Sequence, residues 1–137
     1  MAETFKLEIV TPEARIYSEE VNVVTLPGSE GELGIYPNHV PLMTQVHAGE
    51  IVVNRSGNEE VLAVGEGFIE VTGNHVAILT DNAANSADID EAAAEEAKAK
   101  AEKRLSEGGD VSEDEARALS QAILYSEAQI KVKRRGR

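Results

Sequence analysis

The sequence contains no cysteine and no tryptophan, and its only aromatic residues are two Phe and three Tyr among 137 residues. The absence of cysteine excludes a disulfide framework, a thiolate metal site, an iron–sulfur cluster and a cysteine nucleophile. A membrane-spanning helix needs roughly 20 consecutive apolar residues, and no apolar run here approaches that length. The first residues include an early acid and no apolar stretch, so we expect neither a secretory signal nor a transit peptide. Any membrane association is expected to be indirect, through partners.

Positive charge is scarce and unevenly distributed. The chain has 13 Lys and Arg against 25 Asp and Glu, which gives a formal net charge of −12. Residues 1–84 contain 13 acids and 3 bases, whereas residues 85–137 contain 12 acids and 10 bases. Because nucleic-acid binding needs a basic face, this balance argues against a free-standing nucleic-acid binder.

Half of the bases in the second part of the chain lie at its end. They are Lys131, Lys133, Arg134, Arg135 and Arg137. One interpretation of this basic end is a solvated tail. The other is a group that docks on an acidic surface of a partner, since clustered cations bind complementary charge.

Short strand patterns fill residues 1–84. Residues 5–9 alternate between apolar and charged side chains, which is typical of a half-buried strand. Two hairpins are predicted where apolar runs flank turns centred on Gly57 and Gly73. Strands this short and this regularly spaced predict an all-β sandwich or flattened barrel. The paired acids Glu59 and Glu60 are interpreted as solvated strand ends.

Residues 85–137 indicate two helices. Residues 88–91 resemble a capping box with Asp88 as the N-cap, and residues 112–115 form a second capping box that opens the next helix. The pair Gly108-Gly109 is expected to end the first helix. Because the link between the helices is short, they should lie antiparallel as a helical hairpin.

The apolar face of the first helix consists mostly of alanine. The predicted stripe repeats every four residues, at Ile89, Ala93, Ala97, Ala101 and Leu105. A methyl-sized group contributes only about 0.8 kcal/mol when it is buried. We therefore hypothesise that the hairpin is weakly attached and adopts more than one docked position, separated by a few kcal/mol.

No constellation of residues indicates catalysis or a cofactor. His39, His47 and His75 are scattered and lack the spacing of metal ligands. The chain has no Gly-x-Ser-x-Gly elbow and no Walker-type phosphate loop. Residues 65–67 (Gly-Glu-Gly) are too short for a dinucleotide fingerprint, and the acid between the glycines would repel a phosphate. We expect no metal, no cofactor and no enzymatic activity in this chain.

Residues 26–42 stand out because they combine three Gly and three Pro with apolar side chains. One interpretation is a long, rigid connection between strands. The other is an interaction surface, since ordered loops on a rigid scaffold commonly bind partners. In that case the polar contacts would come from Glu32 and His39. The apolar contacts would come from Leu33, Ile35, Tyr36 and Val40.

Residues 28–42 (Gly-Ser-Glu-Gly-Glu-Leu-Gly-Ile-Tyr-Pro-Asn-His-Val-Pro-Leu) resemble the most characteristic stretch of the epsilon subunit of bacterial F-type ATP synthases. Residues 67–71 (Gly-Phe-Ile-Glu-Val) and 88–92 (Asp-Ile-Asp-Glu-Ala) match the same family. The resemblance implies a sandwich of two packed five-stranded sheets over residues 1–84 and a regulatory helical hairpin over residues 85–137.

The resemblance also implies a function and partners. Members of that family are non-catalytic central-stalk (rotor) subunits at the cytoplasmic face of the bacterial inner membrane. Their sandwich binds the gamma subunit and rests on the c-subunit ring. Carried over by position, the partner-binding residues are Glu30, Glu32, Leu33, Tyr36 and His39. Glu32 is expected to face the c ring, and His39 is expected to lie near gamma.

In the family, the hairpin inhibits ATP hydrolysis when it extends along gamma and reaches the beta and alpha subunits. We expect Lys131, Lys133, Arg134 and Arg135 to strengthen that state, because the beta subunits present an acidic segment to this region. Deletion of residues 131–137 is expected to raise ATP hydrolysis and to leave assembly intact.

One family feature is degraded. Some members bind ATP at a motif of the form Ile-Asp-x-x-Arg-Ala, and here Ala93 takes the place of the arginine. The remaining candidates for nucleotide contact are Ile89, Asp90 and Lys100. Loss of a bidentate phosphate partner predicts weak or absent ATP binding, although an ATP-level sensor stays the alternative function. A sugar- or peptide-binding sandwich would share the fold but usually shows more exposed aromatics, and a hydrolase would need a nucleophile–base pair.

Overall fold

Ten strands form the first part of the molecule in the computed structural model, which describes residues 3–135. Alternation builds the first of them, because Phe5, Leu7 and Ile9 are buried while the residues between them are half-buried. The strands are β1 (Phe5–Val10), β2 (Arg15–Val21), β3 (Val23–Gly28), β4 (Gly31–Ile35), β5 (Leu42–Val46), β6 (Gly49–Arg55), β7 (Asn58–Val64), β8 (Gly67–Thr72), β9 (His75–Thr80) and β10 (Ala83–Asn85).

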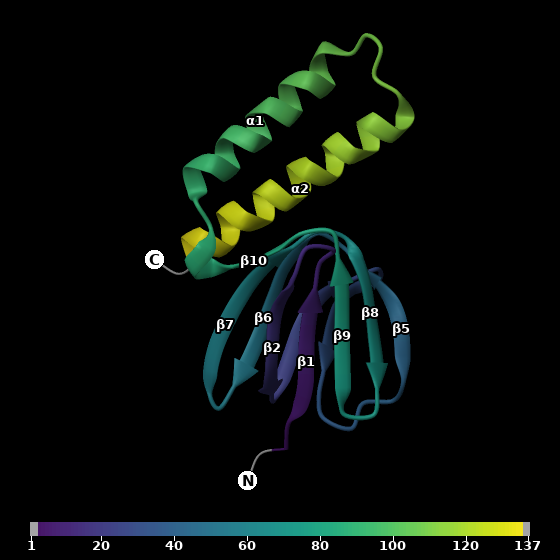
Figure 1. The fold of residues 1–137 in the computed structure, drawn as a ribbon, viewed down its shortest axis with the longest axis vertical. Coiled ribbons are helices and arrows are strands. Elements are labelled where there is room, and N and C mark those ends of the chain that lie inside the picture. The colour runs from purple at the N-terminus through teal and green to yellow at the C-terminus, as the bar shows by residue number, and fades with distance from the viewer. Residues whose placement is uncertain (1–2, 136–137) are drawn as a thin grey trace.

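The strands pack as two layers of five (Figure 1). One layer holds β10, β7, β6, β3 and β4, and the other holds β5, β8, β9, β1 and β2. A single residue pair, Gly28 of β3 with Val46 of β5, connects the layers in the hydrogen-bonded path. The neighbours are antiparallel except for β1 and β9, which are parallel. The predicted sandwich of two five-stranded sheets is confirmed.

The two predicted hairpins are present. Arg55 pairs with Asn58 across a two-residue turn in which Ser56 and Gly57 have φ values of 53° and 81°. Two positive φ values are typical of a type I′ turn, whose twist matches that of the strands it joins. In the β8–β9 hairpin, Gly73 provides the positive φ of 56°. These tight turns fix the register and so decide which side chains enter the core.

The C-terminal part is an antiparallel helical hairpin, as the sequence predicts. It consists of a short 3-10 helix (Ser86–Asp88), α1 (Glu91–Glu107) and α2 (Glu113–Arg135). Gly108 and Gly109 end α1 with φ values of 65° and 74°. α2 lies along one end of the sandwich and α1 packs on the far side of α2 (Figure 1). The hairpin is therefore folded against the sandwich.

One local prediction for α1 is wrong and another is right only in part. The N-cap is Asp90, whose Oδ1 accepts a hydrogen bond from the Ala93 amide at 3.1 Å, and Asp88 belongs to the 3-10 helix instead. The predicted stripe is confirmed at Ile89 and Ala101, which are buried, but Ala93 and Ala97 are exposed and Ala94 is buried in their place. Both errors arise because the acids alternate and alanines fill neighbouring positions, so several registers match the pattern equally well.

The second capping box is confirmed on one side. Ser112 Oγ accepts a hydrogen bond from the Glu115 amide at 3.1 Å. The Glu115 carboxylate does not close the box but pairs with Arg104 of α1 at 3.0 Å. This ion pair joins the two helices near the tip of the hairpin. In residues 3–135, no helix is long and apolar enough to cross a lipid bilayer.

Candidate partner-binding surfaces

The first surface is the foot loop, residues 36–41, which follows β4. Asn38, whose φ is 63°, holds the loop in place by two hydrogen bonds. Its backbone amide donates to Asn74 Oδ1 at 3.3 Å, and its side-chain amide donates to Glu3 Oε2 at 2.9 Å. Tyr36 is 60% exposed and Val40 is 70% exposed. The fixed backbone thus presents two large apolar side chains to water, which is typical of a binding loop on a rigid scaffold.

His39 lies inside the foot loop. Its Nδ1 is 2.8 Å from the carbonyl oxygen of Val40. Because a carbonyl only accepts, Nδ1 carries the proton in this arrangement and Nε2 remains for a partner. Leu33 of β4 is half-buried and packs against the sandwich core. It therefore contributes to the support of the surface more than to the surface itself.

The structure does not bring all the predicted contacts of residues 26–42 together. Glu30 lies in the β3–β4 turn, and Glu32 pairs with Pro27 near that turn. Tyr36 and His39 follow the other end of β4, beyond the pair of Ile35 with Val24. Glu32 lies four residues before Tyr36, which at about 3.4 Å per residue along a strand is roughly 14 Å. The two acids and the foot loop are thus two separate candidate surfaces.

A second surface was not predicted from the sequence. The outer face of β5, β8 and β9 carries Met43, Phe68 and Leu79, all of which are exposed. Phe68 lies directly opposite Leu79 in the β8–β9 ladder, so their side chains emerge on the same face. The signal was available, because Phe68 and Leu79 alternate with the buried residues Ile69 and Ile78 and so occupy positions that usually carry polar side chains. We call it the β5–β8–β9 face.

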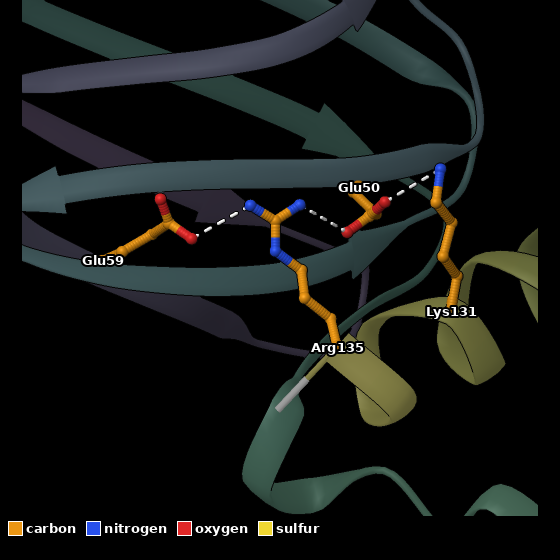
Figure 2. A network of polar contacts seen from close by, with 4 residues as sticks. All are labelled: Glu50, Glu59, Lys131 and Arg135. Atoms are coloured by element: carbon orange, nitrogen blue, oxygen red, sulfur yellow. Dashed lines mark hydrogen bonds and ion pairs between the residues drawn. The ribbon is translucent and has the colours of Figure 1, made fainter. Parts of the chain in front are cut away.

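The third surface, the basic end of α2, is docked on the chain's own sandwich (Figure 2). The Arg135 guanidinium lies between two carboxylates, 3.2 Å from Glu50 and 2.9 Å from Glu59. Lys131 Nζ is 3.1 Å from the other oxygen of Glu50. In this conformation, the acidic surface that the basic end of α2 contacts therefore belongs to the same chain. Glu59 is thus not simply solvated as expected, and neither is Glu60, which accepts from the Tyr17 hydroxyl at 2.9 Å.

The other basic residues of this end have different partners. Arg134 pairs with two acids of α1, Glu91 at 3.0 Å and Glu95 at 2.8 Å. Lys133 Nζ donates to the Ser86 carbonyl at 3.1 Å. Arg137 lies outside the described residues. Neighbouring arginines thus serve different purposes: Arg134 holds the two helices together, and Arg135 holds the hairpin to the sandwich.

The candidates for nucleotide contact do not form a site in this conformation. Ile89 is buried between the hairpin and the sandwich, and the Asp90 carboxylate caps α1. Lys100 is exposed and lies ten residues further along the helix, about 15 Å away at 1.5 Å per residue. At the start of α1 the Arg134 guanidinium is occupied by two carboxylates. A phosphate that approached Arg134 would compete with these two carboxylates.

The comparisons with known proteins decide the family. Residues 4–86 match the family model described as "ATP synthase, Delta/Epsilon chain, beta-sandwich domain". The chain is also 42% identical over 109 residues to the ATP synthase epsilon chain of Desulforamulus reducens, which covers 80% of this chain and 83% of that relative. The chain belongs to the ATP synthase delta/epsilon family. Its resemblance to epsilon subunits is thereby confirmed.

Two solved structures extend the likeness of fold across the helical hairpin. A chain of the Euglena gracilis mitochondrial ATP synthase, in a structure of OSCP, F1 and c-ring, matches with a TM-score of 0.72 and 22% identity over 91% of this chain and 78% of that one. A chain of the Tetrahymena thermophila central stalk and c-ring matches with a TM-score of 0.59 and 11% identity over 96% and 97% of the two chains. The sandwich with its hairpin is thus a fold that this chain shares with these two chains.

Proposed function

We propose that this chain is a non-catalytic central-stalk subunit of a proton-transporting F-type ATP synthase, in which it couples the gamma subunit to the c-subunit ring. The observation that carries the proposal is a rigid sandwich that exposes large apolar side chains at two places, the foot loop and the β5–β8–β9 face. Exposed apolar patches of this kind mark protein interfaces. The matched Tetrahymena structure is described as central stalk and c-ring, which supports these partners.

Binding to gamma and the c ring gives a direct test. We expect the paired substitutions Phe68→Ser and Leu79→Ser, and separately Tyr36→Ser and Val40→Ser, to weaken co-purification with gamma and the c ring by tenfold or more. The matched control is Leu124→Ser, because Leu124 is 45% exposed but lies on the hairpin. Retention of both partners by both paired variants would contradict the docking proposal. Circular dichroism of each variant controls for folding.

Glu30, Glu32 and His39 have finer proposed roles. Both acids are exposed and lie near the β3–β4 turn, where they would attract cationic loops of the c ring. His39 would contact gamma from the foot loop. The proposed location is the cytoplasmic face of the bacterial inner membrane, peripheral and held there through the complex. Glu32→Lys is expected to weaken c-ring binding while gamma binding persists, and equal loss of both partners would contradict this assignment.

The helical hairpin has a proposed regulatory role. When it leaves the sandwich, it would extend to the beta and alpha subunits and inhibit ATP hydrolysis. Support comes from the basic residues of α2, whose partners in the folded state are surface acids that an acidic partner surface could replace. Deletion of residues 131–137 is expected to raise ATP hydrolysis by the reconstituted complex. Unchanged hydrolysis in an intact complex would contradict the inhibitory role.

The alternative function, an ATP-level sensor, has less support. Ala93 is exposed near the start of α1 and offers no phosphate donor from its side chain, and Arg134 is engaged by Glu91 and Glu95. We expect isothermal calorimetry with ATP to show no binding in the micromolar range. A micromolar dissociation constant for the isolated chain would restore the sensor as the leading regulatory function.

A further inference from the structure

The hairpin is held on the sandwich by a small apolar contact. The buried residues of this contact are Ala63, Ile89, Ala128 and Val132, with Val61, Ala84 and Tyr125 partly buried around them. Two of the four buried side chains are single methyl groups, so the apolar area is modest. The contact involves the C-terminal half of α2, whereas the main core of the sandwich is a separate cluster.

An open groove of about 390 Å³ lies between the first half of α2 and the loops at Gly65 and Asn82. Gln121 of α2 lines this groove, and among residues 3–135 its buried Oε1 has no hydrogen-bond partner. The buried residues of α2, which are Ser126, Ala128 and Val132, all lie in its second half.

Ion pairs supply the remaining attachment. At the N-terminal end of α2, Arg117 pairs with Glu66 at 2.8 Å. At the C-terminal end, Lys131 and Arg135 both reach Glu50 of β6, whose side chain is only 11% exposed. Arg135 also reaches Glu59 of β7 (Figure 2). Two cations and two carboxylates thus join the last turns of the hairpin to adjacent strands.

We propose that Glu50, Glu59, Lys131 and Arg135 form an ionic latch that selects the docked position of the hairpin and keeps its two cations from any acidic partner. While the hairpin is docked, Glu50 and Glu59 hold Lys131 and Arg135 at the sandwich, away from any surface that only the released hairpin reaches. The sandwich carboxylates thus compete internally for the cations that an acidic surface would bind. Partner binding then requires release, and the apparent affinity falls with the fraction of released hairpins.

The charge distribution supports this assignment. The first 84 residues carry 13 acids against 3 bases, so the sandwich attracts the basic end of α2 over some distance. The side chains of Lys131, Arg135 and Glu59 are exposed, so salt screens their charges over a Debye length of about 8–10 Å at physiological ionic strength. These properties suit a contact that opens and closes.

Two adjacent arginines provide a matched pair for the test. Arg135 binds the sandwich, whereas Arg134 pairs within the hairpin, with Glu91 and Glu95. Arg135→Gln and Arg134→Gln remove the same charge from the same helical turn. Since the chain lacks cysteine, the full-length protein can carry two unique spin labels, at Glu13→Cys on the sandwich and Glu102→Cys on α1. Both positions are exposed.

Pulsed electron–electron double resonance measures the distance between the two spin labels and so reports whether the hairpin is docked. We expect the double variant Lys131→Gln and Arg135→Gln to raise the ratio of released to docked hairpins by about tenfold, since it loses three surface ion pairs. Arg134→Gln should leave the ratio within about twofold. Raising the salt concentration from about 0.05 to 0.5 M should release the hairpin of the parent chain. The same change should leave the ratio of released to docked hairpins in the double variant nearly unaffected. A double variant that stays docked like the parent at both salt concentrations would overturn the latch.

Charge exchange separates the latch from a folding defect. Lys131→Glu with Arg135→Glu should release the hairpin, and adding Glu50→Lys and Glu59→Lys to that variant should restore docking with the polarity reversed. Failure of the exchange to restore docking, with the circular dichroism of the sandwich unchanged, would also overturn the proposal. Restoration supports it.

The consequence for a partner rests on the proposed inhibitory role. In the reconstituted ATP synthase, Glu50→Gln with Glu59→Gln should strengthen inhibition of hydrolysis by about fivefold to tenfold, because the cations are no longer held. Released hairpins with unchanged hydrolysis would leave the latch standing and would contradict the inhibitory role. Hairpins that stay docked in the distance measurement would remove the latch, whatever the hydrolysis assay shows.

Discussion

Gly67 of β8 and Leu79 of β9 approach so closely that no side chain fits between them. A Cβ atom on Gly67 would collide with the backbone carbonyl oxygen of Leu79 and would lie 2.8 Å from Thr80 Cα. Backbone atoms in a sheet cannot move aside as the end of a flexible side chain can. The glycine at the start of this strand is therefore required by the pairing of β8 with β9, which supports the exposed residues Phe68 and Leu79.

Gly67→Ala is expected to destabilise the sandwich by about 2–3 kcal/mol, a size typical of overpacking against a rigid neighbour. Gly65→Ala is the matched control, because a Cβ there meets side-chain atoms only at an ordinary 3.6 Å. Urea unfolding followed by circular dichroism gives the two free energies of unfolding. Equal free energies of unfolding for the two variants would show that β8 and β9 can move apart to accommodate a Cβ atom without loss of stability.

The sequence predicts those parts of the fold that local chemistry determines. Period-two burial in β1 and the glycine turns at Gly57 and Gly73 depend on residues within a few positions of one another. β4 was missed because its residues, Gly31–Ile35, have no apolar alternation, and pairing with β3 holds it in place. β2 and β5 also lack a regular apolar alternation, because few of their side chains are buried.

The candidate binding surfaces show the same difference between features set by neighbouring residues and features set by distant ones. The sequence predicts the foot loop as part of residues 26–42, because glycines, prolines and apolar residues are adjacent in that segment. The partners of Arg135 were not predicted, because Glu59 and Glu50 lie 76 and 85 residues away along the chain. No local pattern indicates which carboxylate a long cationic side chain will reach. The stripe on α1 is wrong at Ala93 and Ala97 for another reason, since neighbouring alanines at positions 92–94 make several helical faces equivalent.

Val132 tests the apolar part of the hairpin contact. Its side chain is 1% exposed between α2 and the sandwich. Val132→Ala removes two methyl groups from this contact and is expected to weaken docking by about 1.5 kcal/mol. Leu124→Ala, on the exposed side of the same helix, should have little effect. Hydrogen exchange of the Ala63 and Ala84 backbone amides would report the change, and equal exchange in both variants would contradict the assigned contact.

Glu8 predicts an acid-dependent step in the stability of the sandwich. A hydrogen bond with His75 at 2.6 Å, assisted by the charge of Arg15, lowers the pKa of Glu8 below its ordinary value of 4.5. A carboxylate whose pKa is depressed in the folded state stabilises the protein above its ordinary pKa, and this contribution is lost as the pH falls through the lowered value. The free energy of unfolding should therefore fall below about pH 4.5.

Glu8→Gln removes this contribution, so its stability should depend less steeply on pH between about 5 and 3 than that of the parent chain. Glu70→Gln, exposed on the outer face of β8, is the control and should follow the parent. Urea unfolding at each pH provides the comparison. Parallel pH curves for Glu8→Gln and the parent would mean that the contact with His75 does not favour the ionised carboxylate.

Tyr125 predicts the opposite dependence for hairpin docking. Burial against the sandwich raises the pKa of its hydroxyl above the ordinary value of 10.0, because the phenolate is poorly solvated there. A group whose pKa is raised in the docked state favours docking fully below its ordinary pKa, and that contribution is lost as the pH rises through the raised value.

Docking should therefore weaken above about pH 10, and Tyr125→Phe should remove part of that weakening. The distance measurement compares Tyr125→Phe with the parent chain across this pH range. If Tyr125→Phe leaves the alkaline release unchanged, the tyrosine is solvated and the contact assigned to it is wrong.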